Sequence, residues 1–167
     1  MTSDAHTSDT PELPTRGATA DRSWRRALRH RTGKRQLATA EPGILAELRG
    51  LRARVPHLTG GVVATTDGLV IAHDAAGLEP EGMAALSAAS LGVGTRLTET
   101  GGQGGFSELL ARGEQGYVAT YAAGASLILT VVGSLAMNVG RLHLEARRCS
   151  GRIGDLVEGA QDTHERI

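Results

Sequence analysis

The sequence predicts an α/β (α+β) domain whose helices and strands follow the order α-β-β-α-β-β-β-α. Three stretches place apolar residues at the alternating short intervals that mark one face of a helix. Between them lie shorter runs rich in β-branched residues, separated by glycine-containing turns, as the strands of a sheet are. The chain of 167 residues has room for one such domain and a tail, because domains usually run about 100 to 150 residues.

The first predicted helix runs from Pro42 to just before Pro56. Pro42 suits a first helical turn and Pro56 suits a stop, because proline lacks the N–H that a helix interior needs. The apolar face of this helix consists of Ile44, Leu48, Leu51 and Val55. Two β-rich runs follow at 61–66 and 69–73, joined by an Asp-Gly dipeptide at 67–68 that favours a tight type I′ turn. We therefore predict a β-hairpin directly after the helix.

A second helix is predicted over 79–100, where Glu79 and Glu81 complement the positive N-terminal end of the helix dipole. Its apolar face consists of Met83, Leu86, Ser90, Val93 and Leu97, and most of its other residues are small. Gly92 and Gly94 each cost about 1 kcal/mol relative to alanine in a helix interior, which suggests that another backbone approaches closely. The alternative is an alanine-rich helix that is poorly optimised.

Three further strands are predicted at 106–110, 114–121 and 126–132. The third has apolar residues on both faces, as a strand in the middle of a sheet does. The last helix, 138–159, has an apolar stripe that predicts docking on a sheet or on a partner helix. This stripe consists of Val139, Leu142, Ala146, Cys149, Ile153 and Leu156. We therefore interpret the cysteine as a small buried hydrophobe and not as a reactive thiol.

Residues 1–40 differ in composition from the rest of the chain and are predicted to form a disordered basic tail. They hold eight Lys or Arg and four Asp or Glu, giving a net charge of +4 against −4 for the remaining residues. The basic run in this tail consists of Arg22, Arg25, Arg26, Arg29, Arg31, Lys34 and Arg35. We place the folded domain at 41–160 and a short C-terminal tail at 161–167.

The basic run has two interpretations. If it became helical on a surface, Trp24 and Leu28 would lie one turn apart beside arginines, a pattern compatible with anionic membrane, nucleic acid or an acidic partner protein. The alternative is a solvated tail with no specific partner. The chain shows neither the apolar core of a signal peptide nor a run of roughly 18 apolar residues, and its single cysteine cannot form an internal disulfide. We therefore expect a cytoplasmic protein.

No pattern for catalysis, metal binding or cofactor binding stands out. Gly33 and Lys34 lack the upstream glycine and the following Ser or Thr of a phosphate-binding loop. The six histidines form no helical pair with an intervening glutamate, and Ser126 lacks the glycine of a nucleophile elbow. Asp67 and Asp74 are interpreted as turn and strand-end residues and not as paired catalytic carboxylates. We expect a protein that is not an enzyme and has no cofactor.

Several stretches follow one another in a fixed order along the chain. They are residues 55–63 and 66–72 around the hairpin, the small-residue helix 83–100, the strand residues 116–118 and 126–132, and residues 138–142 at the start of the last helix. In this order they resemble the roadblock / dynein light chain family, and specifically its bacterial members. The resemblance covers about 44–153, which is nearly the whole predicted domain.

The resemblance implies a five-stranded antiparallel sheet between helices, paired into a homodimer through the second helix and the neighbouring third strand. A close helix–helix crossing needs small residues, so those expected at the dimer interface are Ala85, Ala88, Ala89 and Gly92. Relatives act on small Ras-like GTPases as activating proteins or scaffolds and donate no arginine finger. The expected function is a non-enzymatic dimeric regulator or scaffold of a small Ras-like GTPase in bacterial signalling.

Two other functions stay open. In one, the folded domain only dimerises while the basic tail binds anionic membrane or nucleic acid. Such binding would disappear with residues 1–40 and would weaken steeply with salt. In the other, the domain senses a small molecule, an interpretation that the scarcity of aromatic side chains disfavours.

Overall fold

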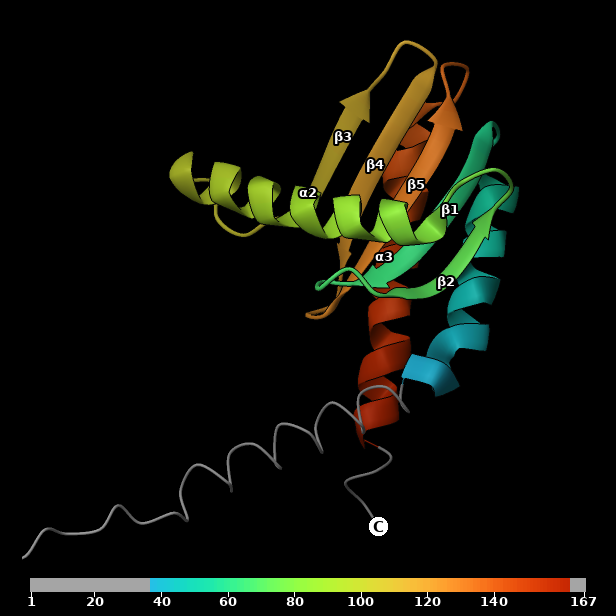
Figure 1. The fold of residues 1–167 in the computed structure, drawn as a ribbon, viewed down its shortest axis with the longest axis vertical. Helices are drawn as coiled ribbons and strands as arrows, with labels where there is room; N and C mark the ends of the chain where they lie inside the picture. Colours follow the sequence, from blue (N-terminus) through green and yellow to red (C-terminus); the bar gives the residue numbers. More distant parts are fainter. Residues whose placement is uncertain (1–36, 163–167) are drawn as a thin grey trace, which may run out of the picture. The chain divides into compact units, whose positions relative to one another are not determined.

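The fold is a five-stranded sheet with α2 on one face and two helices on the other, in a computed structural model that describes residues 37–162 (Figure 1). The strands are β1 (Leu58–Thr65), β2 (Val70–Ala75), β3 (Glu108–Arg112), β4 (Gly116–Ala123) and β5 (Leu127–Ser134). The helices are one that includes 37–54, α2 (Pro80–Thr100) and α3 (Val139–Asp162).

All neighbouring strands are antiparallel, in the order β2-β1-β5-β4-β3. The predicted order of elements and the antiparallel five-stranded sheet are both confirmed. β5 lies in the middle of the sheet and its first five residues are buried, as its two apolar faces predict. β2 and β3 are the two edge strands.

The larger core lies between the sheet and the pair formed by α3 and the first helix. The predicted face of the first helix is confirmed, since Ile44, Leu48, Leu51 and Val55 are at most 3% exposed. Two ion pairs join the helices, Arg54 Nε to Glu145 Oε2 at 2.9 Å and Arg152 Nη2 to Glu47 Oε2 at 2.9 Å. Because these pairs are partly exposed, they align the helices more than they stabilise them.

The predicted stripe of α3 is confirmed over most of its length. Leu142, Ala146, Cys149 and Ile153 are fully buried in the larger core. At the end of the stripe, Val157 is buried and Leu156 is 38% exposed, with its side chain against Gly43 of the first helix. The helix begins after Asn138, whose Oδ1 accepts a hydrogen bond from the Arg141 N–H at 2.8 Å and so caps the first turn.

The core under α2 is smaller, and its buried apolar side chains among the described residues are Val62, Ala64 and Ala84. α2 meets the sheet through small or hydroxyl side chains, among them Ser87 and Gly94. Thr130 of β5 donates a hydrogen bond to the Ser87 hydroxyl at 2.7 Å, and the Thr120 hydroxyl of β4 lies 3.2 Å from that of Thr130. A large apolar side chain in place of Ser87 would remove the acceptor to which the buried Thr130 hydroxyl donates.

The apolar face predicted for this helix is therefore not the face that packs on the sheet. Leu86, Val93 and Leu97 point outward, and Met83 and Ser90 are half-buried. The start of α2 agrees with the prediction, since Pro80 is its first residue and the Glu79 carboxylate accepts a hydrogen bond from the Gly82 N–H at 2.6 Å.

Several predicted boundaries differ from the structure; β1, for example, begins at Leu58, three residues before its predicted start. Residues 37–41 are already helical, with Leu37 packed against the core and Ala40 buried, so Pro42 does not mark the first turn. Residues 1–36 and 163–167 of the two predicted tails lie outside the described residues. The third strand begins at Glu108, two residues later than predicted, because Phe106 packs on Gly94 of α2 instead of joining the sheet.

The turn between β1 and β2 also differs from its prediction. A type I′ turn needs positive φ at both central residues, but only Gly68 has it, at 88°, and Asp67 does not. The Gly68 N–H donates to the Thr65 carbonyl at 2.9 Å, and the Leu69 N–H donates to the Thr65 hydroxyl at 3.0 Å. The Thr65 side chain thus stabilises a longer turn than the dipeptide alone predicts.

Candidate interaction surface

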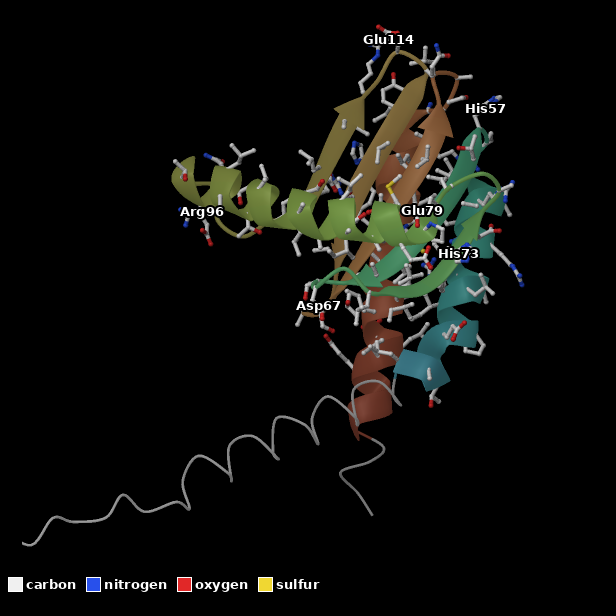
Figure 2. The ribbon with its side chains drawn as sticks, viewed as in Figure 1. His57, Asp67, His73, Glu79, Arg96 and Glu114 are labelled. Carbon is white, nitrogen blue, oxygen red and sulfur yellow. The ribbon has the colours of Figure 1, made fainter. Side chains whose placement is uncertain are left out.

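The outer side of α2 is apolar, and no other part of residues 37–162 covers it. Leu86, Val93 and Leu97 are 66%, 58% and 63% exposed, and they recur at helical spacing with Ala89 between them. A contiguous apolar surface of this kind marks an interaction site more often than a solvated face. Arg96 lies on the same side near the end of the helix (Figure 2), where its aliphatic stem can cover apolar surface. We call Leu86, Ala89, Gly92, Val93 and Leu97 the exposed α2 face.

The four predicted interface residues lie on or beside this face. Ala85, Ala89 and Gly92 are exposed. Ala88 is half-buried, and its Cβ lies close to Gly68 in the turn between β1 and β2. A large side chain at Ala88 would therefore collide with the chain's own turn, which makes it a poor probe of an interface with another molecule.

Gly92 and Gly94 in the interior of α2 have different surroundings. A Cβ at Gly94 would overlap the ring of Phe106, so the chain itself needs glycine there. A Cβ at Gly92 would meet nothing within 4 Å. Because glycine costs about 1 kcal/mol in a helix interior, the described residues offer no packing reason for Gly92. A close approach by another molecule would supply one.

β3 is the edge strand nearest to the C-terminal half of α2, and its outer side is unpaired within the described residues (Figure 1). Its sequence, Glu-Leu-Leu-Ala-Arg, contains neither proline nor lysine to block another strand. Among the described residues, an open strand edge thus lies beside an exposed apolar helix face, and both features suit a protein partner.

Glu108, the first residue of β3, is tied to α3. Arg147 donates two hydrogen bonds to its carboxylate, at 2.7 and 2.6 Å. His143 Nδ1 lies 3.2 Å from the same carboxylate and 2.9 Å from the hydroxyl of Tyr121. The Arg147 guanidinium lowers the pKa of Glu108, and burial raises the pKa of the Tyr121 hydroxyl. The cluster therefore holds an ionised carboxylate in a fixed position at the edge of the sheet.

A cleft of about 550 Å³ lies beside this cluster, lined in part by Thr98, Gln103, Phe106, Glu108 and Arg147. Its two charged side chains neutralise each other through their bidentate pair. The cleft thus presents no unbalanced charge to orient a small molecule, and we interpret the cluster as a clamp between β3 and α3.

The remaining predicted residues have no part in this surface. Burial raises the pKa of the Cys149 thiol to about 11, in line with its interpretation as a buried hydrophobe. Asp74 lies 3.5 Å from Arg52, in an exposed ion pair. Within residues 37–162, no group of three or more His, Cys, Asp or Glu side chains is placed to hold a metal ion. No helix in that range is long and apolar enough to cross a membrane. The tail residues Arg22, Arg25, Arg26, Arg29, Arg31, Lys34 and Arg35 lie outside the described residues.

Sequence reasoning missed the large side chains of the exposed α2 face and the charged ends of β3. Leu86, Val93 and Leu97 have the spacing of a core face, so periodicity alone cannot tell an inner face from an outer one. The signal that favours the observed arrangement is the pair of neighbouring threonines, Thr120 and Thr130, of which Thr130 donates a hydrogen bond to Ser87 of the helix above. That signal requires the strand register, which the sequence does not supply.

Comparisons with known proteins agree with the fold. The family model of the Roadblock/LC7 domain matches residues 44–133, more than half of the chain. A comparison with curated proteins gave no match.

Several solved structures share the fold. MglB with a tetrameric arrangement has a TM-score of 0.67 at 19% identity, covering 72% of this chain and 92% of that one. Gliding protein MglB from Thermus thermophilus has a TM-score of 0.64 at 19% identity, covering 74% and 92%. A Roadblock/LC7 domain from Streptomyces avermitilis has a TM-score of 0.57 at 24% identity, covering 72% and 97%. Identities this low establish the shared fold and nothing beyond it.

Proposed function

This chain belongs to the Roadblock/LC7 domain family, and we propose that it is a non-enzymatic, dimeric regulator or scaffold of a small Ras-like GTPase in the bacterial cytoplasm. The observation that carries the proposal is the exposed α2 face beside the open edge of β3. The family resemblance implies relatives that act on small Ras-like GTPases as activating proteins or scaffolds and donate no arginine finger. A regulator of this kind needs a shaped surface and no catalytic side chain.

The free energy gained by burying apolar side chains supports self-association through the exposed α2 face. Covering the exposed parts of Leu86, Val93 and Leu97 would contribute about 1–2 kcal/mol for each side chain, and a symmetric dimer covers each of them twice. Association itself costs about 4–15 kcal/mol in lost freedom of motion. The helix face alone would therefore give a weak dimer, and the hydrogen bonds available at the edge of β3 are the natural second contribution. One of the similar structures is described as tetrameric, which is compatible with self-association in this fold.

Regulation of a GTPase follows from a difference in affinity between its two nucleotide states. A partner shifts an equilibrium only by its differential affinity, and a tenfold preference corresponds to about 1.4 kcal/mol. An interface of modest size supplies that difference. The proposal therefore requires no residue of this chain to take part in the chemistry of hydrolysis.

The test is an equilibrium titration of the full chain against the small Ras-like GTPase encoded nearest to it. The GTPase is loaded with GDP in one series and with a non-hydrolysable GTP analogue in the other. We expect binding with a preference for one state of tenfold or more. An accompanying hydrolysis assay separates the two forms of the proposal, because a changed rate indicates a regulator and an unchanged rate indicates a scaffold.

A matched variant of the full chain separates this proposal from a tail-driven adaptor. Replacing the seven basic residues of the tail, Arg22 to Arg35, by glutamine leaves the described domain unchanged. GTPase binding should survive this change. If the substitution abolishes binding, and wild-type binding also falls steeply with salt, the tail and not the domain is the binding element.

A further inference from the structure

Three arginines gather around one glutamate where the first helix meets α3. Arg54 Nε donates to Glu145 Oε2 at 2.9 Å, and Arg148 Nη1 lies 3.7 Å from Glu145 Oε1. Arg141 lies one turn before Glu145 on the same side of α3, and its side chain forms no ion pair within residues 37–162. The three guanidinium groups and the single carboxylate leave a net charge of +2 at this junction.

The arginines are the outer members of this cluster. The side chains of Arg54 and Arg148 are 39% and 61% exposed, against 16% for Glu145. Arg141 is exposed as well. A guanidinium has five N–H donors, and the contacts with Glu145 use few of them. The outer surface therefore presents donors for oxyanions, while the balancing carboxylate lies beneath.

Arg54 has a donor without an acceptor. Its Nη2 is buried and makes no hydrogen bond to any described residue. A buried donor in this state is destabilising, because it has lost water and gained no partner. Gly50, one turn earlier, leaves room for the guanidinium, since a Cβ there would lie 3.0 Å from Arg54 Nη1. A carboxylate bound from outside would draw this guanidinium outward and satisfy the donor.

An exposed leucine lies between two of the arginines. Leu144 is 50% exposed, three residues after Arg141 and four before Arg148, so it neighbours both on the helix surface. We call Arg54, Arg141, Leu144 and Arg148 the arginine face. It lies on the two helices that cover the side of the sheet opposite α2 (Figure 1), and it therefore stays free in a dimer formed through the exposed α2 face.

The composition of the arginine face selects one kind of anionic ligand. A nucleic-acid backbone offers phosphates but no apolar group to cover Leu144. A membrane surface takes up several apolar side chains from a bound helix, and this face offers one. The chain's own basic run, 22–35, has the same charge as the face and is repelled by it. A protein segment with carboxylates on both sides of an apolar residue complements both the charges and the leucine.

We propose that the arginine face binds a short acidic segment of a partner protein, whose carboxylates pair with Arg141 and Arg148 on either side of an apolar side chain that covers Leu144. Guanidinium groups suit this role because they bind carboxylates through two parallel hydrogen bonds. Arg141 and Arg148 are two helical turns apart, about 10 Å, so the segment needs only a few residues. Because this face and the exposed α2 face lie on opposite sides of the sheet, one chain can hold an acidic partner and a GTPase together. The inference goes beyond the proposed GTPase binding and does not depend on it.

The test uses the full chain with the seven basic residues of the tail replaced by glutamine, so that the tail cannot bind acidic ligands itself. The probe is an acetylated and amidated helical peptide with glutamate at i and i+7 and leucine at i+4, which matches the spacing of Arg141, Leu144 and Arg148. We expect calorimetric titration to show binding that weakens with salt. Arg141→Glu and Arg148→Glu should each weaken it at least tenfold, and so should glutamine in place of the peptide's glutamates.

Two controls separate a specific site from damage to the fold and from net charge. The double variant Arg141→Glu with Arg148→Glu should bind the same peptide with lysine in place of glutamate, which a misfolded chain could not do. Arg49 is an exposed arginine of the first helix on a different side from Arg54. Arg49→Glu makes the same change in net charge and should keep the affinity of the parent chain. A loss equal to that in Arg148→Glu would overturn the proposal, because net charge alone would then explain binding.

The remaining outcomes identify a different occupant. No binding of the acidic peptide, or undiminished binding by both single variants, would overturn the proposal. Tighter binding to phosphatidylserine vesicles or to duplex DNA, lost in Arg148→Glu, would assign the face to a membrane or to nucleic acid instead. A lower oligomeric mass of the two variants would assign it to a second copy of the chain. The GTPase titration is repeated with both variants: retained GTPase binding supports a separate partner site, and lost GTPase binding would overturn it by assigning the face to the GTPase.

Discussion

The two glycines of α2 provide a matched pair of substitutions whose effects should have opposite signs. Both lie in the interior of the helix, two residues apart, so Gly92→Ala and Gly94→Ala receive the same gain of about 1 kcal/mol in helix propensity. At Gly92 the new Cβ meets no atom within 4 Å. At Gly94 it overlaps the Phe106 ring, which must move.

The magnitudes follow from these surroundings. Gly92→Ala should stabilise the monomer by about 1 kcal/mol, which raises the melting temperature by roughly 3–5 °C for a domain of this size. Gly94→Ala carries an overpacking cost of about 1–3 kcal/mol against the same gain, so it should be neutral or destabilise by up to about 2 kcal/mol. In the double variant Gly94→Ala with Phe106→Ala, the overpacking cost disappears. The alanine at 94 should then stabilise relative to Phe106→Ala alone.

The assay is urea unfolding of the full chain in a Val93→Asp background, in which we expect the molecules to be monomeric. The free energy of unfolding is compared among the variants at one pH and one protein concentration. Equal stabilisation by Gly92→Ala and Gly94→Ala would refute the packing of Phe106 on α2. Destabilisation by Gly92→Ala in the monomer would refute the claim that no part of the same chain approaches Gly92.

Three further outcomes follow from single sites. Val93→Asp places a charge in the exposed α2 face and should convert the dimer to monomer without lowering monomer stability, as light scattering and thermal unfolding would show; an intact dimer would move the interface elsewhere. Arg147 lowers the pKa of Glu108, so their pair stabilises the fold above the ordinary carboxyl pKa of about 4 and loses that contribution as the pH falls through the lowered value. Glu108→Gln should therefore be less stable than wild type at pH 7, by urea unfolding, and the difference should shrink below about pH 4; a difference independent of pH would contradict the pair's role. The Cys149 thiol, whose pKa burial raises to about 11, should resist a thiol reagent at pH 8 until denaturant unfolds the chain, and rapid labelling of the folded protein would contradict its burial.

The sequence predicted the order of elements because local signals agreed with one another. The apolar positions of the first helix and of α3 have a strict helical period, and the structure buries all of them except Val139 and Leu156 of α3. The central position of β5 followed from apolar residues on both of its faces. Pro80 and the acids beside it marked the start of α2 to within one residue.

What the sequence could not supply were features that depend on contacts between distant segments. The orientation of α2 depends on Thr120 and Thr130, whose proximity to Ser87 exists only in the folded sheet. The later start of β3 depends on Phe106 filling the space above Gly94. The role of Glu108 depends on Arg147, which lies 39 residues further along the chain.

Only part of the candidate surface could be predicted, because the rest depends on contacts between distant segments. The small residues of α2 predicted an interface on this helix, and Ala85, Ala89 and Gly92 are exposed. The larger side chains beside them and the charges of Glu108 and Arg112 could not be assigned to a surface before the register of the sheet was known. Periodicity identifies a face of a helix, and only the packing decides which way that face points.

The central claim is that a dimer of this chain binds a small Ras-like GTPase. The most direct measurement is the mass and affinity of the complex formed with the GTPase encoded nearest to it, for the wild-type chain and for Val93→Asp in parallel. We predict a complex that contains two copies of the wild-type chain, with a tenfold or greater preference for one nucleotide state and at least tenfold weaker binding by the monomeric variant. Absence of binding in both nucleotide states at about 100 μM, or equal binding by the monomeric variant, would contradict the account.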